Sequence, residues 1–483
     1  MCYKIMIFVR NTTIRTPPEQ GDAFADQEKC RAASMKLRSF RGGIHPREHK
    51  RLTENKPVET CPCPNRVVIP LQQHTGSPAQ PLVKVGDKVR TGQKIGDLTG
   101  FISAAHHASI SGEVTYIGRA PHPLTRNAVA VEITSDGKDD WTPLHSISQE
   151  NLAALSGEDI RDIVAQSGIV GLGGAAFPTH VKLSPPAGKK PELYILNGAE
   201  CEPCLTCDDR LMRERAKDII AGLRLLMRAV GVNRGIVAVE SNKPEAIAAL
   251  KEKVAREPGI SLEVVKVKYP QGAEKQLINA LTGREVPPGG LPMDVGVAIN
   301  SVGTAVAVAD AVIRGKPLVE RVITVTGSAI ADPKNLLVRI GTALGYVIEQ
   351  CGGFKEPPAK IIVGGPMMGV AQYSLDAPVI KGTSGIIAFT QDDVADETYY
   401  PCIRCGRCVT VCPMRLSPSK LGILAENSRF VEAKQANLMD CMECGSCVYV
   451  CPANRPMVQW VKFAKNELRK IAEQESRKKK ESA

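Results

Sequence analysis

The chain has 483 residues, which is too long for one hydrophobic core and predicts roughly three or four domains. No apolar run approaches the ~18–20 residues that a membrane span needs, and no small-residue cleavage site follows the apolar run at the start. The net charge of +11, with 4% aromatic residues and no nucleic-acid motif, argues against nucleic-acid binding and fits a membrane surface or an acidic partner.

The first part of the chain is predicted to hold an extension and a small β-rich unit. Met35 opens a fresh start, so we expect residues 1–34 to be a non-native or disordered extension. The short runs that follow are broken by Gly and Asp, which predicts a β-barrel or sandwich. They resemble the barrel–sandwich hybrid of biotinyl and lipoyl carriers, but residues 104–108 lack the lysine of the hairpin tip. We expect a docking module in which His106 and His107 are simple turn residues.

The rest of the chain reads as alternating elements followed by a helical, cysteine-rich region. Over residues 150–315, strand-like runs alternate with helix-like runs, which predicts a parallel sheet with crossover helices. A smaller strand–helix–strand unit follows over 316–385. Helix-like runs flank the cysteines of residues 395–465, and the polar, basic residues 473–483 are expected to be disordered.

Four segments of the α/β region carry candidate ligand-binding residues. In the first, residues 168–182, glycines 171, 173 and 174 let the backbone N–H groups approach a planar or anionic ligand. This segment fits neither the Rossmann nor the Walker fingerprint, so a tight turn between elements is an equal alternative. The other three match the ends of parallel strands, where α/β proteins bind ligands: residues 197–203, 269–275 and 300–304.

Two copies of one cysteine pattern, Cys-x2-Cys-x2-Cys-x3-Cys-Pro, lie near the C-terminus. This is the bacterial ferredoxin run, in which the fourth cysteine ligates the cluster of the other run. It predicts two [4Fe–4S] clusters, one held by Cys402, Cys405, Cys408 and Cys451, and the other by Cys441, Cys444, Cys447 and Cys412. Zinc ribbons use two pairs of ligands instead. Because the ligand thiols must stay reduced, we expect a cytoplasmic protein.

The sequence motifs resemble those of a known family. GLGGAAFPTHVK, NGAECEP, YPQGAEKQL and AINSVGTA are similar to the flavin-binding motifs of the family that contains the 51-kDa NADH-oxidising subunit of respiratory complex I. Three further features restrict the resemblance to one family: the stretches RGGIHP and IPLQQHTGSPAQPLVKVGD, and the twin cysteine runs. Residues 35–465 resemble the RnfC family, which provides one subunit of the Rnf ion-translocating electron-transport complexes.

The resemblance implies a multidomain α/β protein with four modules. These are a barrel–sandwich hybrid (35–140), an FMN- and NADH-binding α/β domain of the complex I 51-kDa type (150–315), an SLBB β-grasp domain (316–385) and an α-helical dicluster ferredoxin domain (395–465). It implies an electron-transfer subunit of a membrane ion-pumping ferredoxin:NAD oxidoreductase, peripheral on the cytoplasmic face. Electrons would pass between NAD(H), FMN and the clusters, with other Rnf subunits, and ferredoxin indirectly, as partners.

The resemblance also assigns roles to residues, none of them an acid or base catalyst. Gly171, Gly173 and Gly174 would lie beside the isoalloxazine and ribityl chain, and Asn197 would bond the flavin. The remaining residues would line the same cleft: Asn300 and Thr304 near the phosphate, Phe177 and Glu202 facing the nicotinamide nucleotide, Lys182 offering positive charge, and Glu200 and Glu274. The complex I family has an arginine where Leu172 stands. Glu202 has a structural alternative, as a cap of the following turn.

Two other functions use the same modules. A cobalamin (corrin) reductase is expected to carry the barrel–sandwich module after the clusters, whereas here it comes first. A pure iron–sulfur wiring subunit would need neither the glycine segment nor Asn197. The run Cys201-x2-Cys204-x2-Cys207 copies the opening of a cluster motif without its fourth cysteine, so free thiols are the default there and at Cys61, Cys63 and Cys351.

Overall fold

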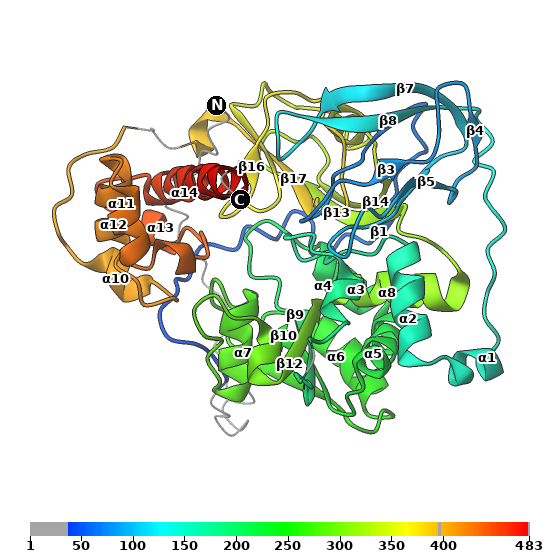
Figure 1. Ribbon diagram of the computed structural model, residues 1–483, viewed down its shortest axis with the longest axis horizontal. Helices are drawn as coiled ribbons and strands as arrows, with labels where there is room; N and C mark the ends of the chain where they lie inside the picture. The colour runs from blue at the N-terminus through cyan, green and yellow to red at the C-terminus, as the bar shows by residue number, and fades with distance from the viewer. Residues whose placement is uncertain (1–36, 187, 395–397, 482–483) are drawn as a thin grey trace, which may run out of the picture.

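The computed structural model describes residues 37–186, 188–394 and 398–481, which form four packed units (Figure 1). The extension predicted for residues 1–34 lies outside the described residues. Within the described part of the chain, no helix is both long enough and apolar enough to cross a membrane. The described part of the chain starts with an arm, residues 37–57, which contacts the second, third and fourth units.

The first unit is a sandwich of two small antiparallel sheets, with strand orders β2-β8-β7-β4 and β3-β5-β6. Its core consists of alternate residues of these strands, among them Val67, Ile69, Val131 and Ile133. The strands are β2 (Arg66–Pro70), β3 (Gln80–Pro81), β4 (Lys88–Val89), β5 (Lys94–Asp97), β6 (His106–His107), β7 (Gly112–Pro121) and β8 (Asn127–Ser135).

His106 and His107 are buried strand residues, so their prediction as turn residues is wrong. They form β6, which pairs with β5 and is covered by the neighbouring units. His106 Nδ1 lies 3.2 Å from Gln73 Nε2. Burial, reinforced by the nearby Lys381 ammonium, lowers the pKa of His107 to about 3 and places that of His106 well below its ordinary value. The place where a carrier domain would expose its lysine is therefore an internal joint.

The second unit contains a parallel four-stranded sheet in the order β11-β10-β9-β12. Helix α7 covers one face of it, and α5, α6 and α8 cover the other (Figure 1). Because both faces are covered, the strands are apolar nearly throughout. The strands are β9 (Leu193–Gly198), β10 (Gly235–Glu240), β11 (Ile260–Val265) and β12 (Val297–Ser301). The helices are α1 (Gln149–Ala154), α2 (Gly157–Gln166), α3 (Thr179–Lys182), α4 (Cys207–Glu214), α5 (Ala216–Val230), α6 (Pro244–Val254), α7 (Glu274–Thr282), the 3-10 turn η2 (Pro292–Val295) and α8 (Val302–Arg314).

The third unit is a mixed six-stranded sheet with the order β1-β14-β13-β17-β15-β16. Its edge strand β1 comes from the segment directly after the arm and pairs in parallel with β14, with Val58 opposite Asn335. No local sequence pattern predicts this strand, because it is stabilised by a partner strand far away in the sequence. The elements are β1 (Val58–Thr60), β13 (Glu320–Thr326), β14 (Lys334–Arg339), α9 (Leu344–Glu349), β15 (Lys360–Val363), β16 (Val370–Ala371), β17 (Gly385–Phe389) and η3 (Gln391–Asp393).

The fourth unit is helical and carries both cysteine runs. Leu421, Leu424, Leu438 and Val461 form its core, in which α11, α12 and α14 meet. Its elements are α10 (Arg407–Val411), α11 (Pro418–Glu426), α12 (Phe430–Gln435), η4 (Leu438–Asp440), α13 (Ser446–Tyr449) and α14 (Met457–Glu481).

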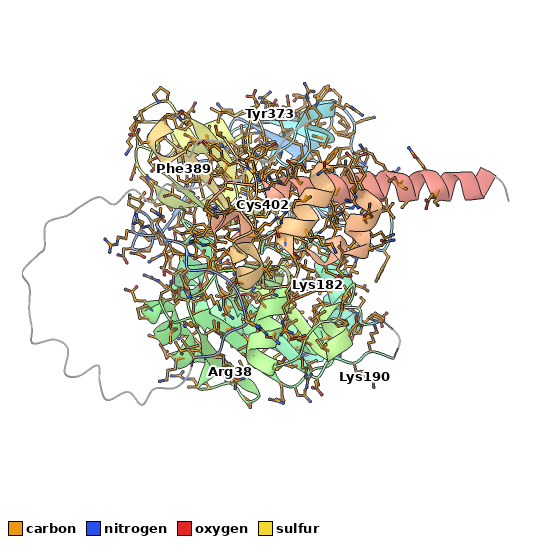
Figure 2. The ribbon with its side chains drawn as sticks, turned by 90° about the vertical axis from the view of Figure 1, so that its left-hand side faces the viewer. Arg38, Lys182, Lys190, Tyr373, Phe389 and Cys402 are labelled. Carbon is orange, nitrogen blue, oxygen red and sulfur yellow. The ribbon has the colours of Figure 1, made fainter. Side chains whose placement is uncertain are left out.

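The C-terminal tail is helical through Glu481, so the disorder predicted from residue 473 is wrong in the described part of the chain. The tail consists largely of Glu, Gln, Arg and Lys, which have high helix propensity and continue a helix that is already nucleated by packing. Figure 2 shows this end of α14 extending away from the body of the molecule.

The arm ties the second and fourth units together. The backbones of Ile44 and Tyr269 exchange two hydrogen bonds, of 2.8 and 2.9 Å. The N–H of Gly43, one residue earlier, donates to the carbonyl of Val411 in the fourth unit, at 2.8 Å. A Cβ at Gly43 would lie 2.6 Å from the Tyr269 carbonyl oxygen, so this close passage requires glycine.

Candidate cofactor sites

The glycine segment forms a loop at the carboxyl edge of the parallel sheet, beside the start of α8. Gly171 N–H donates to the Phe177 carbonyl at 2.8 Å, which closes the loop, and Leu172 N–H donates to Thr304 Oγ1 at 3.0 Å. A Cβ at Gly173 would lie 3.5 Å from Ser301 Cβ. The structure therefore brings the predicted segments 168–182 and 300–304 into contact.

The tip of this loop is open to a ligand. Gly173, Gly174 and Ala175 are exposed, and within the described residues the N–H groups of Gly173 and Gly174 have no acceptor. Gly174 has a φ of +113°, a conformation that a residue with a side chain rarely adopts. Two free N–H groups on a glycine turn form a concave donor surface suited to a phosphate or a ring carbonyl.

The start of α8 adds further donors to this place. Ser301 caps the helix by accepting a hydrogen bond from Thr304 N–H at 3.3 Å. Asn300 is buried, and its Oδ1 accepts a hydrogen bond of 2.7 Å from the Tyr194 hydroxyl. Its Nδ2 is buried with no acceptor in the described part of the chain. A buried donor without a partner is costly, and a flavin oxygen or phosphate would satisfy it, so these residues fit FMN.

Asn197 and the Lys182–Glu274 pair hold neighbouring segments together. Asn197 Nδ2 donates to the Gly272 carbonyl at 2.8 Å, and its Oδ1 accepts from Ala199 N–H at 3.0 Å. Lys182 Nζ lies 2.9 Å from Glu274 Oε2, so its charge is paired. These contacts connect the segment 269–275 to the segments 197–203 and 168–182. All four predicted segments therefore meet at one edge of the sheet.

Glu200 lies in a buried cluster of charges rather than in an open cleft. Its carboxylate is 3.2 Å from Lys243 Nζ and 3.5 Å from Lys50 Nζ, and it accepts a hydrogen bond of 2.8 Å from Asp208 N–H. Burial acts to raise the pKa of Glu200, but the two ammonium groups outweigh it and lower the pKa. Lys50 belongs to the arm, and the sequence held no signal that it reaches this motif.

Glu202 contacts the third unit. Its two carboxylate oxygens accept hydrogen bonds of 3.0 Å from the backbone N–H groups of Met367 and Met368. A Cβ at Gly365 would lie 2.3 Å from Glu202 Oε2, so the turn approaches the carboxylate closely only because it has glycine there. Burial raises the pKa of Glu202 to about 7, against the effect of these two bonds. Its nucleotide role stays a prediction.

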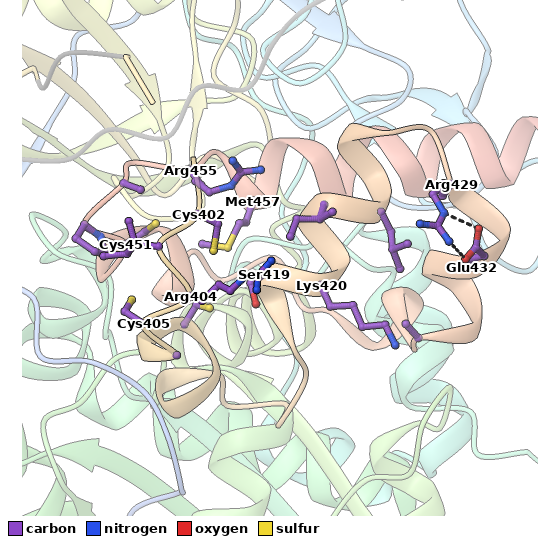
Figure 3. Close-up of a pocket in the computed structure, with 18 of the residues that line it drawn as sticks. Cys402, Arg404, Cys405, Ser419, Lys420, Arg429, Glu432, Cys451, Arg455 and Met457 are labelled. Carbon is purple, nitrogen blue, oxygen red and sulfur yellow. Dashed lines mark hydrogen bonds and ion pairs between the residues drawn. The ribbon is translucent and has the colours of Figure 1, made fainter. Parts of the chain in front are cut away.

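The first predicted cysteine set lines one cavity of the fourth unit. Cys402, Cys405, Cys408 and Cys451 border a space of about 630 Å³, together with Arg404, Lys420 and Arg429 (Figure 3). Figure 3 shows Cys402, Cys405 and Cys451 around this space. Arg429 is paired with Glu432, which also borders this space, so Arg404 and Lys420 are the basic side chains that suit a cluster, since a cluster with four thiolate ligands is negative overall.

The second predicted set lines a smaller cavity of about 30 Å³: Cys412, Cys441, Cys444 and Cys447. Both runs form their loops in the same way, with left-handed residues at matching places, Arg404 and Gly406 in one and Glu443 and Gly445 in the other. In each run, this backbone turns the three leading cysteines toward one space. Cys451 lines the first cavity and Cys412 the second, which is the arrangement that the crossed assignment expects; the ligand sets themselves stay predictions.

The remaining cysteines do not form such a group. Cys201 Sγ accepts a hydrogen bond of 3.2 Å from Gly272 N–H, and burial raises the pKa of Cys204 to about 12. Within the described residues, no three His, Cys, Asp or Glu side chains are placed to hold a single metal ion. A cubane spreads its four ligands over four separate irons, so its cysteines need not meet at one point.

The second cavity lies against the flavin-type unit. The buried Tyr269 hydroxyl donates to the carbonyl of Cys444 at 2.7 Å, and Gln276 Nε2 donates to that of Pro413 at 3.4 Å. Tyr269 belongs to one of the four converging segments. Cys405, at the first cavity, is exposed instead. The sequence did not single out Tyr269 as the residue that connects the two sites.

Together, these features define an electron-transfer protein with a flavin-type nucleotide domain joined directly to a two-cluster ferredoxin-type unit. Sequence models of four domain families match the chain: the RnfC barrel sandwich hybrid domain at 38–138, the Nuo51 FMN-binding domain at 164–310, the SLBB domain at 322–371 and the 4Fe-4S dicluster domain at 394–452. They confirm the predicted fold class and the cofactors FMN and [4Fe–4S].

Curated relatives match nearly the whole chain. The C subunit of the proton-translocating ferredoxin:NAD(+) oxidoreductase complex of Clostridium ljungdahlii is 52% identical over 445 residues, 92% of this chain and 96% of that protein. The C subunit of the Na(+)-translocating complex of Acetobacterium woodii is 46% identical over 436 residues, 90% and 98% of the two chains. The C subunit of the ion-translocating oxidoreductase complex of Rhodobacter capsulatus is 47% identical over 91% of this chain and 84% of that protein.

The chain therefore belongs to the RnfC family of the Rnf ion-translocating ferredoxin:NAD⁺ oxidoreductase complexes, as its motifs predicted. It is an oxidoreductase subunit, one part of a multi-subunit complex.

Proposed function

We propose that the chain passes electrons between NAD(H), FMN and its two [4Fe–4S] clusters, and that the cluster at Cys412, Cys441, Cys444 and Cys447 is the one nearer the flavin. One observation carries this proposal: Tyr269, from a segment of the flavin site, is hydrogen-bonded to Cys444 at 2.7 Å. When bound, FMN accepts a hydride from NADH and releases its electrons singly, which the clusters then carry.

The chain's own residues bind and orient these groups. The free N–H groups of Gly173 and Gly174, the start of α8 and Asn300 Nδ2 supply donors for the flavin. Lys182 and Glu274, partly exposed, form the rim of the same site, and we assign Phe177 and Glu202 to the side of the nicotinamide nucleotide. The direct bonds between the units would hold the flavin site and the second cysteine set at a fixed separation.

The surroundings of the molecule follow from its family and charge. We propose that it sits on the cytoplasmic face of the membrane, bound to the membrane subunits and iron–sulfur subunits of its complex, and exchanges electrons with ferredoxin through them. The net charge of +11 supports contact with an anionic lipid surface or an acidic partner.

The test is an anaerobic reconstitution of the full chain. We expect about eight irons and one FMN per chain, since the dicluster motif supplies two four-iron sites. Addition of NADH should bleach the flavin and then produce the EPR signal of reduced clusters. About four irons, or bound FMN that does not respond to NADH, would contradict the proposal.

A further inference from the structure

Two buried cations of the third unit form no salt bridge with any carboxylate of the described residues. Arg321 of β13 is 6% exposed, and Lys381, before β17, is 1% exposed. Among the described residues, no carboxylate oxygen lies within 4.0 Å of either cation. Lys50 and Lys243, which are buried just as deeply, share Glu200 instead. A buried cation without a counter-ion is costly, so it needs another physical explanation.

Both cations donate to backbone carbonyls at the glycine loop. Arg321 donates to the Leu172 carbonyl at 3.3 Å, and Lys381 Nζ donates to the Gly168 carbonyl at 2.7 Å and to the Ala105 carbonyl at 2.6 Å. Arg321 also donates to the carbonyl of Lys381 itself. The two cations thus form one connected group behind residues 168–172.

The bond to Leu172 acts on the open side of the loop. The Leu172 carbonyl and the Gly173 N–H belong to one trans peptide, so they point in opposite directions. A guanidinium on the carbonyl polarises that peptide and makes its N–H a stronger donor. That N–H is one of the two that have no acceptor in the described structure. The cation therefore strengthens the donor that faces a ligand.

The neighbouring acid cancels this charge only in part. Asp208 is the carboxyl that interacts with Arg321, and burial together with Glu200 raises the pKa of Asp208 to about 7, so near neutral pH it is only partly ionised. The loop is also held from both sides: a Cβ at Gly382 would lie 3.4 Å from Ala176 Cβ, and Thr75 N–H donates to the Ala176 carbonyl at 3.3 Å. The first and third units together shape a loop of the second.

We propose that Arg321 and Lys381 are positioning residues for the flavin: both hold the glycine loop in its binding conformation, and the Arg321 guanidinium also supplies positive potential behind it. This inference rests on the proposed FMN site at residues 171–174. Since the added electrons make the flavin more negative, the charge of Arg321 would favour its reduced form.

The test compares FMN binding in full-length variants. Arg321→Met and Lys381→Met should each weaken FMN binding about ten- to a hundredfold, as expected for the loss of a charged hydrogen bond. In Arg321→Met the midpoint potential of the flavin that still binds should become more negative, and Arg321→Lys should recover most of both effects. Fluorescence titration gives the affinity, and an anaerobic redox titration gives the potential.

Lys334→Met is the matched control. Lys334 lies on the adjacent strand β14 and is paired with Glu59 at 3.0 Å, so its loss should change neither the FMN affinity nor the potential. If Arg321→Met does not fold, Arg321→Lys and Arg321→Gln give the same comparison of charge. Wild-type affinity and potential in the charge-removing variants would overturn this inference while leaving the FMN site intact. A wild-type chain that binds no FMN would instead reject the proposed function.

Discussion

At the scale of single residues, two acidic residues of the same motif have different environments. Glu200 and Glu202 are two positions apart in one motif, yet one is paired with Lys50 and Lys243 and the other accepts two backbone N–H groups. Neither environment was readable from the motif, because every partner comes from a distant segment. The cysteine sets were readable, because their spacing itself dictates which loops can surround a cluster.

Crossed ligation can be tested by pairing serine substitutions. Cys412→Ser combined with Cys444→Ser should remove no more than one cluster, about half of the iron, because both changes fall on the same site. Cys412→Ser combined with Cys405→Ser should remove both clusters. Iron analysis and EPR measure the difference. The opposite ranking of the two double variants would assign Cys412 to the cluster of its own run.

At the scale of elements, the Gly-Gly-Pro-Met-Met-Gly turn after β15 is bound by one carboxylate. Glu202→Gln keeps an acceptor for one of the two N–H groups and leaves the other facing an NH₂ group. We expect a loss of about 1–3 kcal/mol in the free energy of unfolding, because a hydrogen bond to a charged group is lost. Denaturant melts measure the loss.

The structural role of Glu202 differs from the predicted one, because it binds the turn after β15 rather than the turn that follows it in the sequence. The same variant separates this structural role from the nucleotide role. If it only caps the turn, the NADH affinity of Glu202→Gln should stay within about twofold of the wild-type value, which is less than the loss of one hydrogen bond would cause. A large loss of NADH affinity with unchanged stability would assign the carboxylate to the nucleotide instead.

Elements were predictable from sequence where local patterns determine them. The alternating strands and helices of the second unit and the β-rich first unit follow from hydrophobic periodicity. Strand β1 and the cations Arg321 and Lys381 were not predicted, because their partners lie hundreds of residues away. The helical end of α14 was missed for the opposite reason, since its charge suggested disorder while its intrinsic helix propensity prevailed.

At the scale of the whole molecule, three units meet around Lys381 and a group of buried histidines. Burial lowers the pKa of His74 to about 4, that of His107 to about 3 and that of Lys381 to about 7. Lys94 and Lys381 act on His107, and Lys381 and His180 act on His74. The histidines and Lys381 of this joint therefore bind protons more readily in the unfolded chain than in the folded one.

Acid should therefore loosen this joint. The unfolded chain binds more protons below the ordinary histidine pKa of 6.5, so stability should fall from pH 6.5 toward pH 4, by on the order of 1–3 kcal/mol for each buried histidine. The lowered pKa of Lys381 acts in the same direction between its ordinary value of 10.5 and about 7.

Hydrogen exchange across the first unit, corrected for intrinsic rates, measures the effect. His107→Gln should reduce the dependence of stability on pH, whereas a change at the exposed His45 should leave it intact. If stability changed equally with pH in the wild type, in His107→Gln and in the His45 variant, the buried histidines would not be its cause.

The arm has a further consequence, for the order in which the protein is made and folded. Gly43 bonds to Val411, Arg38 to Leu281 and Lys50 to Glu200, so this segment leaves the ribosome long before any of its partners exists. Because ribosomes add residues in sequence, the arm can pair with the second unit once Glu200 and Leu281 have emerged, whereas its bond to Val411 must wait for the cysteine-rich end. The joining of the second and fourth units through the arm is therefore expected to be a late event of high contact order.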